Sequence, residues 1–238
     1  MYPSPPSDLI FRVTGQRDPD AFATSGRLNA EDVETVLRLV NRDLGDFRRV
    51  LDFGCGCGRL TRFLAEQVDP GAMLCASDID EPAVTWLQQA LPTVRAVVNG
   101  HAPPLPFEPG GFDLIIGWSV FTHLDEALQD AWLQELSRVA APGATLLLTV
   151  HGAYNWRFFA DDAPEELRQD VIEIGHALAA EGFAHWRNDG WQEHFPDYYH
   201  TSWHLPRYVH AHWSRWFEVE DVFGGTARPT QDVVVLRR

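Results

Sequence analysis

Residues 50–58, which read Val-Leu-Asp-Phe-Gly-Cys-Gly-Cys-Gly, constrain the fold of this chain more than any other stretch. A short apolar strand carries Asp52 near its end, and Gly54, Gly56 and Gly58 alternate after it. A helical pattern follows these glycines. Because glycine lets a backbone approach a ligand closely, the succession of strand, glycine turn and helix N-terminus predicts a cradle for a small ligand.

A second acid follows at the distance expected of a ribose-binding residue. Asp78 comes twenty residues after Gly58 and ends an apolar stretch that predicts the next strand. An acid at the tip of that strand is placed to accept hydrogen bonds from ribose hydroxyls. The cradle is therefore predicted to bind a nucleoside.

Two residues of the cradle indicate which nucleoside it binds. The dinucleotide-binding fingerprint requires a glycine where this chain has Arg59. The carboxylate of Asp52 would repel a pyrophosphate, but it suits the cationic amino group and sulfonium of S-adenosylmethionine. The alternative role for Asp52 is that of a helix or turn cap. These residues favour S-adenosyl-L-methionine as the cofactor over a nicotinamide or flavin cofactor.

Further motifs extend this pattern along the chain. The chain resembles the class I S-adenosylmethionine-dependent methyltransferases at residues 50–59, Asp78, 105–107, 112–116, 119–124 and 138–143. These matches keep the order and spacing of the family, and residues 231–236 resemble its last strand. The resemblance implies an α/β fold of the Rossmann-like, doubly wound type. Its mostly parallel seven-stranded sheet has a reversed last strand and helices on both faces.

Hydrophobic patterns predict strands and helices that alternate along the chain, which is typical of a parallel sheet covered on both faces. The expected strands cover residues 49–53, 73–78, 95–98, 112–118, 145–150, 217–222 and 233–236. The expected helices cover residues 30–43, 59–68, 81–91 and 126–140. Asn29 is the expected N-cap of the first helix, and Gly224 with Gly225 is expected to turn the last two strands into an antiparallel pair.

Length and composition fit one elaborated domain, because 238 residues of which 45% are hydrophobic can bury one sizeable core. We expect an N-terminal cap segment and helix at residues 1–45, a cofactor-binding core at 46–150, a substrate lid insert at 151–216 and the last two strands at 217–238. The first residues do not resemble a secretory signal, and no apolar stretch approaches the length of a membrane span. A cytoplasmic location is therefore expected.

The charge balance bears on the partners of the chain. It has 19 basic and 34 acidic residues, a net charge of −15, which opposes binding to a polyanion. We expect a small-molecule acceptor, no nucleic acid and no membrane, and a monomer or homodimer. Cys55 and Cys57 with His101 lack the usual spacing of zinc ligands, so we interpret the cysteines as packing residues and expect no metal.

The adenine contact departs from the family pattern. In related enzymes the residue at position 101 is usually an acid that binds the adenine amino group, but this chain has His101. The contact then falls to the backbone of His101 and Ala102, or to Asn99. The complete set of residues that we predict to contact the cofactor is Asp52, Gly54, Cys55, Gly56, Gly58, Arg59, Asp78, Ile79, Asn99, His101, Ala102, Trp118 and Ser119.

The expected insert at residues 151–216 holds eight of the ten histidines and six of the nine tryptophans. Aromatic walls with a few polar groups are typical of a small-molecule pocket, although each tryptophan is explained more simply as core of the lid. Methyl transfer needs an aligned acceptor atom, and a hydroxyl or protonated amine benefits from a base of near-neutral pKa. We predict His204, His200 and His123 as the catalytic candidates, in that order. His123 also fits a family element that packs beside the cofactor.

The predicted function is S-adenosylmethionine-dependent methylation of a small molecule. The Asn-Pro-Pro-Tyr type of motif found in amino and nucleobase methyltransferases is absent, which favours O-methylation of a hydroxylated metabolite or sugar. The alternatives are N-methylation of a small molecule, a methyltransferase-like module that binds without turnover, and an NAD(P)-dependent oxidoreductase.

Overall fold

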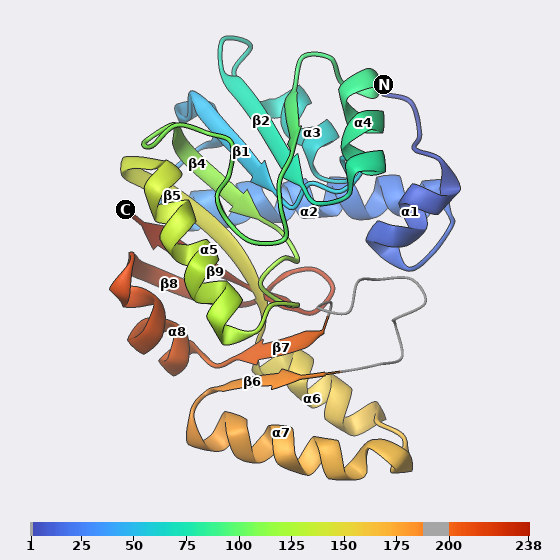
Figure 1. Ribbon diagram of the computed structural model, residues 1–238, viewed down its shortest axis with the longest axis vertical. Helices are drawn as coiled ribbons and strands as arrows, with labels where there is room; N and C mark the ends of the chain where they lie inside the picture. The colour runs from blue at the N-terminus through green and yellow to red at the C-terminus, as the bar shows by residue number, and fades with distance from the viewer. Residues whose placement is uncertain (1, 188–199) are drawn as a thin grey trace.

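The computed structural model describes residues 2–187 and 200–238, whose strands form one mixed sheet with helices on both faces (Figure 1). Five neighbouring strands are parallel, in the order β3-β2-β1-β4-β5. Their bounds are β1 (Arg49–Phe53), β2 (Met73–Asp78), β3 (Arg95–Val98), β4 (Phe112–Gly117) and β5 (Ala140–His151). The carboxyl ends of these strands therefore meet along one edge of the sheet.

The sheet continues past β5 with a reversed strand. β9 (Gln231–Arg237) pairs antiparallel with β5 and with β8 (Glu218–Ala227). The seven strands β3-β2-β1-β4-β5-β9-β8 confirm the predicted doubly wound sheet. The predicted turn at Gly224 and Gly225 is wrong, because both residues lie within β8 and the turn follows Ala227. Gly225 has φ of +64° where the register shifts, as in a β-bulge.

Alternating side chains of the strands build a core on each face. Val50 belongs to the core with apolar residues of α2 (Pro19–Leu39), α3 (Thr61–Gln67) and α4 (Glu81–Ala90). Its neighbour Leu51 belongs to the core with residues of α5 (Glu126–Val139) and α8 (Pro206–His212). This alternation follows from the two-residue period of a strand, and it explains why the central strands are apolar throughout.

The N-terminal region is more helical than the sequence predicted. α1 (Ser7–Thr14) precedes α2, and the side chain of Asp18 caps α2 by accepting from the backbone N–H groups of Asp20 and Ala21. α2 therefore begins at Pro19 rather than at residue 30, so Asn29 is not its N-cap. Asn29 is buried in the middle of the helix, where its amide faces the Ser25 carbonyl and the Trp118 indole N–H.

The segment between β5 and β8 adds a hairpin to the sheet. β7 (Thr201–His204) pairs with β5 where His151 faces Trp203, beyond the end of β4, and β6 (Phe183–Trp186) pairs antiparallel with β7. Within residues 152–187 and 200–217, the described helical elements are α6 (Ala153–Asp162), η2 (Glu165–Leu167), α7 (Arg168–Ala180), α8 and η4 (Trp213–Arg215). Figure 1 shows α6, α7, β6 and β7 together at the lower end of the view. No helix in the described ranges has the length and apolar composition that a membrane crossing requires.

Candidate active site at the carboxyl ends of the strands

A cavity of about 610 Å³ lies at the carboxyl ends of β1, β2 and β4. The glycine turn after β1, the end of β2 and the loop after β4 all contribute to its wall. Ligands of open α/β sheets bind at this edge, because the loops that leave the strands there surround a crevice. The position of the cavity makes it the candidate active site.

The glycine turn joins the ends of β1 and β2. The backbone N–H groups of Gly54 and Cys55 donate to the Ser77 carbonyl, at 2.8 and 3.1 Å. Gly56 has φ of +53°, and a Cβ atom there would lie 2.7 Å from Cγ2 of Val13 on α1. A side chain at position 56 would therefore strain the turn and press on the helix that crosses it.

Asp78, the acid predicted to bind ribose, lies on the cavity wall. Its carboxylate accepts from the N–H of Gly56 at 2.6 Å and from the N–H of Asp80 at 2.9 Å. Burial raises the pKa of Asp78. The guanidinium of Arg12, also on the wall, pairs with both carboxylate oxygens of Asp80 at 2.9 and 3.0 Å. The N-terminal helix is thus tied to the loop that follows Asp78.

Asn99 brings an unpartnered acceptor to the same wall. Its Nδ2 donates to the Gly100 carbonyl at 2.8 Å, whereas its Oδ1 is buried and has no hydrogen-bond partner among the described residues. A buried oxygen without a donor costs free energy, so the position suits a ligand that carries an N–H group.

Of the three histidines predicted as catalytic, His123 is the one on the wall, which also includes His101. His123 lies in the loop after β4, and its Nδ1 is 2.8 Å from the His200 carbonyl oxygen. Because a carbonyl only accepts, the proton is on Nδ1 and the lone pair is on Nε2. Burial lowers the pKa of His123 to about 4, so the ring is neutral near pH 7.

Comparison with known proteins identifies the family. Residues 50–143 match the family model described as a methyltransferase domain. A structure of a Burkholderia thailandensis methyltransferase shares the fold, with a TM-score of 0.62 at 16% identity over 96% of this chain and 84% of that chain. These findings support a class I S-adenosylmethionine-dependent methyltransferase. S-adenosylmethionine is therefore its cofactor, and the glycine turn, Asp78 and the unpartnered Asn99 Oδ1 fit a nucleoside of that kind.

Curated relatives of this methyltransferase transfer methyl groups in more than one chemical setting. An uncharacterized methyltransferase of Synechocystis sp. is 29% identical over 63% of this chain and 72% of its own length. A malonyl-[acyl-carrier protein] O-methyltransferase of Geobacter sulfurreducens is 28% identical over 71% of this chain and 58% of its own length. The Burkholderia thailandensis structure is that of a 1,6-didemethyltoxoflavin-N1-methyltransferase with its substrate and S-adenosylhomocysteine. Oxygen and nitrogen acceptors both occur among these proteins.

Most of the predicted cofactor-binding residues come together on the cavity wall of this methyltransferase. Those on the wall are Gly54, Gly56, Arg59, Asp78, Ile79, Asn99, His101, Trp118 and Ser119. Asp52, Cys55, Gly58 and Ala102 are not part of it. Asp52 is 1% exposed and accepts from the Thr61 hydroxyl at 2.6 Å, and burial raises its pKa to about 6. Its carboxylate therefore lies behind the wall and holds the start of α3.

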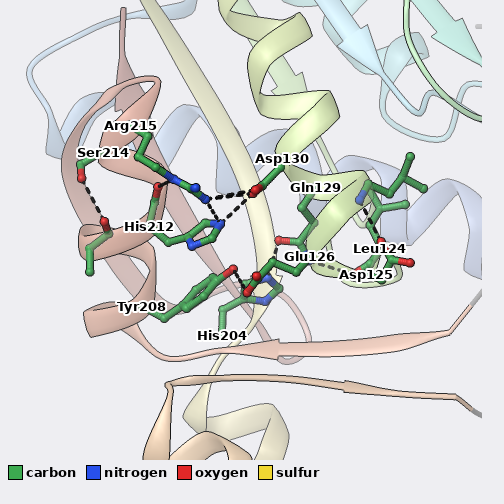
Figure 2. Close-up of polar contacts among 12 residues, drawn as sticks. Leu124, Asp125, Glu126, Gln129, Asp130, His204, Tyr208, His212, Ser214 and Arg215 are labelled. Carbon is green, nitrogen blue, oxygen red and sulfur yellow. Dashed lines mark hydrogen bonds and ion pairs between the residues drawn. The ribbon is translucent and has the colours of Figure 1, made fainter.

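The three histidines predicted as catalytic lie in different surroundings. His204 is 1% exposed, with Nε2 2.9 Å from Oε1 of Gln129 in the core between α5 and α8 (Figure 2). Burial lowers its pKa to about 3. The side chain of His200 does not line the cavity either, although its carbonyl orients His123. Of the three predicted histidines, only His123 lies on the cavity wall.

The sequence did not point to several wall residues. Arg12 and Val13 come from α1, which precedes the first family motif, and nothing in their local pattern connects them with the glycine turn. Asp80 carries a signal that was available, because it is the N-cap of α4 two residues after Asp78. Phe53, Glu81, Pro82, Val120, Leu124 and Trp132 complete the wall. Tyr198 and Tyr199, in the aromatic part of the insert, lie outside the described residues.

Proposed function

We propose that this methyltransferase O-methylates a small hydroxylated acceptor that binds beside His123. The supporting observation is the imidazole of His123 on the cavity wall. This ring is neutral and carries its proton on Nδ1, and the apolar side chains of Val120 and Leu124 belong to the same wall. A hydroxyl group can donate its hydrogen bond to Nε2 of that ring. The wall near this imidazole is otherwise mainly apolar, which suits an acceptor without charge at the reacting end.

The cofactor contacts follow from the groups on the wall. We infer that Asp78 accepts hydrogen bonds from the ribose hydroxyls and that Asn99 Oδ1 accepts from the adenine amino group. The backbone at Gly54 and Gly56 is close to the methionine portion. When bound, S-adenosylmethionine supplies an electrophilic methyl group on a sulfonium.

His123 is assigned an orienting role. A strong general base has a pKa near the working pH, but burial lowers the pKa of His123 to about 4. We therefore infer that the ring accepts the hydrogen bond of the acceptor hydroxyl and turns an oxygen lone pair toward the methyl group. When the hydroxyl oxygen takes the methyl group, the methyl–sulfur bond would break and S-adenosylhomocysteine would leave as the neutral thioether. The hydroxyl proton would move onto Nε2 of His123 and then to solvent. Alignment of this kind accounts for large rate effects in displacement reactions.

The neutral ring also favours oxygen over nitrogen as the acceptor atom. A protonated amine has no lone pair, and an amine pKa near that of lysine, about 10.4, keeps its proton in the presence of an imidazole of much lower pKa. A hydroxyl group has a lone pair at neutral pH. We extend the proposal to residues 151–216, to which we assign recognition of the rest of the acceptor.

Paired acceptors test this proposal. Transfer of tritium from methyl-labelled S-adenosylmethionine is measured to benzyl alcohol and benzylamine, to 2-phenylethanol and 2-phenylethylamine, and to larger pairs built in the same way. We expect the hydroxyl member of a pair to be methylated. His123→Phe should lower kcat about 10²-fold with unchanged affinity for S-adenosylmethionine. His176→Phe, a change of an exposed histidine on α7, is the control.

Two outcomes would contradict the proposal. Methylation of only the amine members would show that the acceptor atom is nitrogen. A His123→Phe variant with the turnover of the parent protein would remove His123 from the acceptor site.

A further inference from the structure

The loop after β4, residues 120–124, carries His123 and depends on two other elements for its hydrogen bonds. From α5, Nε2 of Gln129 donates to the Leu124 carbonyl at 2.8 Å. From β7, the backbone N–H of Ser202 donates to the Thr122 carbonyl at 2.8 Å, and the Ser202 hydroxyl donates to the Leu124 carbonyl at 2.5 Å. Buried carbonyl groups require such partners, so α5 and β7 together determine where this loop lies.

The Leu124 carbonyl also determines the direction of a longer chain of hydrogen bonds. Because that carbonyl only accepts, the Ser202 hydroxyl hydrogen is committed to it. Oγ of Ser202 must then accept from Nδ1 of His185, which is 2.9 Å away on β6. His185 is thus protonated on Nδ1, as His123 is beside the His200 carbonyl.

We propose that Ser202 is a positioning residue for methyl transfer. It is fully buried, and it connects loop 120–124 to both strands of the β6–β7 hairpin. His200, two residues earlier, supplies the carbonyl that orients His123. Ser202 therefore fixes the position of loop 120–124 relative to the His200 carbonyl that orients His123. The proposal rests on the role of His123 proposed above. It gives the hairpin, whose described residues do not line the cavity, a role in holding a residue of the active site.

Loss of the hydroxyl would act on the site through His123. In Ser202→Ala the Leu124 carbonyl loses a buried donor and His185 loses its acceptor, while the backbone bond to Thr122 remains. Loop 120–124 is then free to shift relative to the cofactor-binding wall, and a displacement of about 1 Å can cost about 10²-fold in rate. The cofactor contacts at Gly56 and Asp78 lie on other loops, so affinity for S-adenosylmethionine should not change.

The test combines Ser202→Ala with Ser202→Thr, which restores a hydroxyl. Long-range proton–nitrogen spectra of the histidine rings are recorded with S-adenosylhomocysteine bound, and kcat is measured with an acceptor found in the paired assay. We expect Ser202→Ala to change the ring signals of His185 and His123 and to lower kcat about 10–100-fold, with Ser202→Thr recovering both. Ser214→Ala is the matched control, because Ser214 is exposed and its hydroxyl donates to the Ala211 carbonyl (Figure 2).

The spectra are independent of turnover, so they separate this proposal from the proposed function. Unchanged His123 signals in Ser202→Ala would overturn the positioning role, whether or not kcat falls. A wild-type protein that methylates no hydroxyl acceptor would contradict the proposed function alone. The spectra would still show whether Ser202 controls the orientation of His123.

Discussion

The two parts of the cavity are built in different ways. The cofactor part comes from short stretches that follow β1 and β2, and its central hydrogen bond joins Gly56 to Asp78, 22 residues apart. The acceptor part is held from a distance, because His123 and Leu124 bond to partners 77 and 78 residues later in the chain. The glycine turn is a local motif and is enough to specify the cofactor part. The acceptor part forms only after the β6–β7 hairpin has joined the sheet.

The two parts also bury opposite kinds of titratable group. Asp52 and Asp78 lie in or behind the cofactor wall, and burial raises the pKa of both carboxyl groups. His123, His151 and His204 lie around β5, β7 and the loop after β4, and burial lowers the pKa of each imidazole. The same physical cause, loss of hydration of the charged form, thus gives the two parts opposite responses to pH.

The largest expected effect is a loss of cofactor binding caused by a substitution in the cofactor part alone. Gly56→Val should abolish S-adenosylmethionine binding in equilibrium dialysis, because a β-branched side chain is strained at positive φ and would meet Val13 beside the cavity. Gly110→Val is the control. Gly110 has φ of +66°, and no described atom lies within 4 Å of its Cβ position. If Gly56→Val still binds the cofactor, the glycine turn is not part of the binding site.

A smaller effect is expected when Asp78, at the end of β2 in the cofactor part, is substituted. Asp78→Ala should weaken S-adenosylmethionine binding by about 1–3 kcal/mol, because the ribose hydroxyls would lose a buried acceptor. Isothermal titration calorimetry measures the change. Asp69→Ala, a change of a partly exposed acid that pairs with Arg48, should leave the affinity as it is. Equal affinities of the Asp78→Ala variant and the parent protein would exclude Asp78 from the ribose site.

The smallest expected effect is a difference between the two parts in how their stability changes with pH. Histidines that stay neutral when folded contribute stability above their unfolded pKa of 6.5, and this stability is lost as pH falls toward about 3–4. Asp52 behaves oppositely. Its folded pKa of about 6 exceeds the ordinary 3.8, so the fold gains stability as pH falls through this interval.

Hydrogen exchange of the cofactor-free protein at about pH 7.5 and about pH 5.5 measures this difference. After correction for intrinsic rates, protection of β6 and β7 should fall at the lower pH by about 1 kcal/mol for each buried histidine. Protection of the backbone amides of β1 and the glycine turn should stay the same or rise at the lower pH. A uniform change across the sheet would show that the two parts do not respond separately.

The sequence predicted the elements whose signals are local. The strand, turn and helix around Gly54, and the N-cap at Asp80, depend on backbone preferences of neighbouring residues, and they were predicted close to their observed bounds. The start of α2 was missed because the Asp18-Pro19 cap lies in a segment interpreted as irregular. His204 was misplaced because nothing local shows that its strand packs on Gln129, 75 residues earlier. Long-range packing decides the position of His204, whereas the start of α2 depends on a local cap that the sequence analysis did not recognise.

The position of β9 has a consequence for the order in which the chain acquires its structure. β9 lies between β5 and β8, although it is the last strand along the sequence. During synthesis, β1 to β5 can pair while the far edge of β5 still lacks its neighbour, and unpaired edges of this kind favour association between chains. Insertion of residues 231–237 closes that edge. A strand that is synthesised after β1 to β5 therefore protects the middle of the sheet from pairing with other copies of the chain.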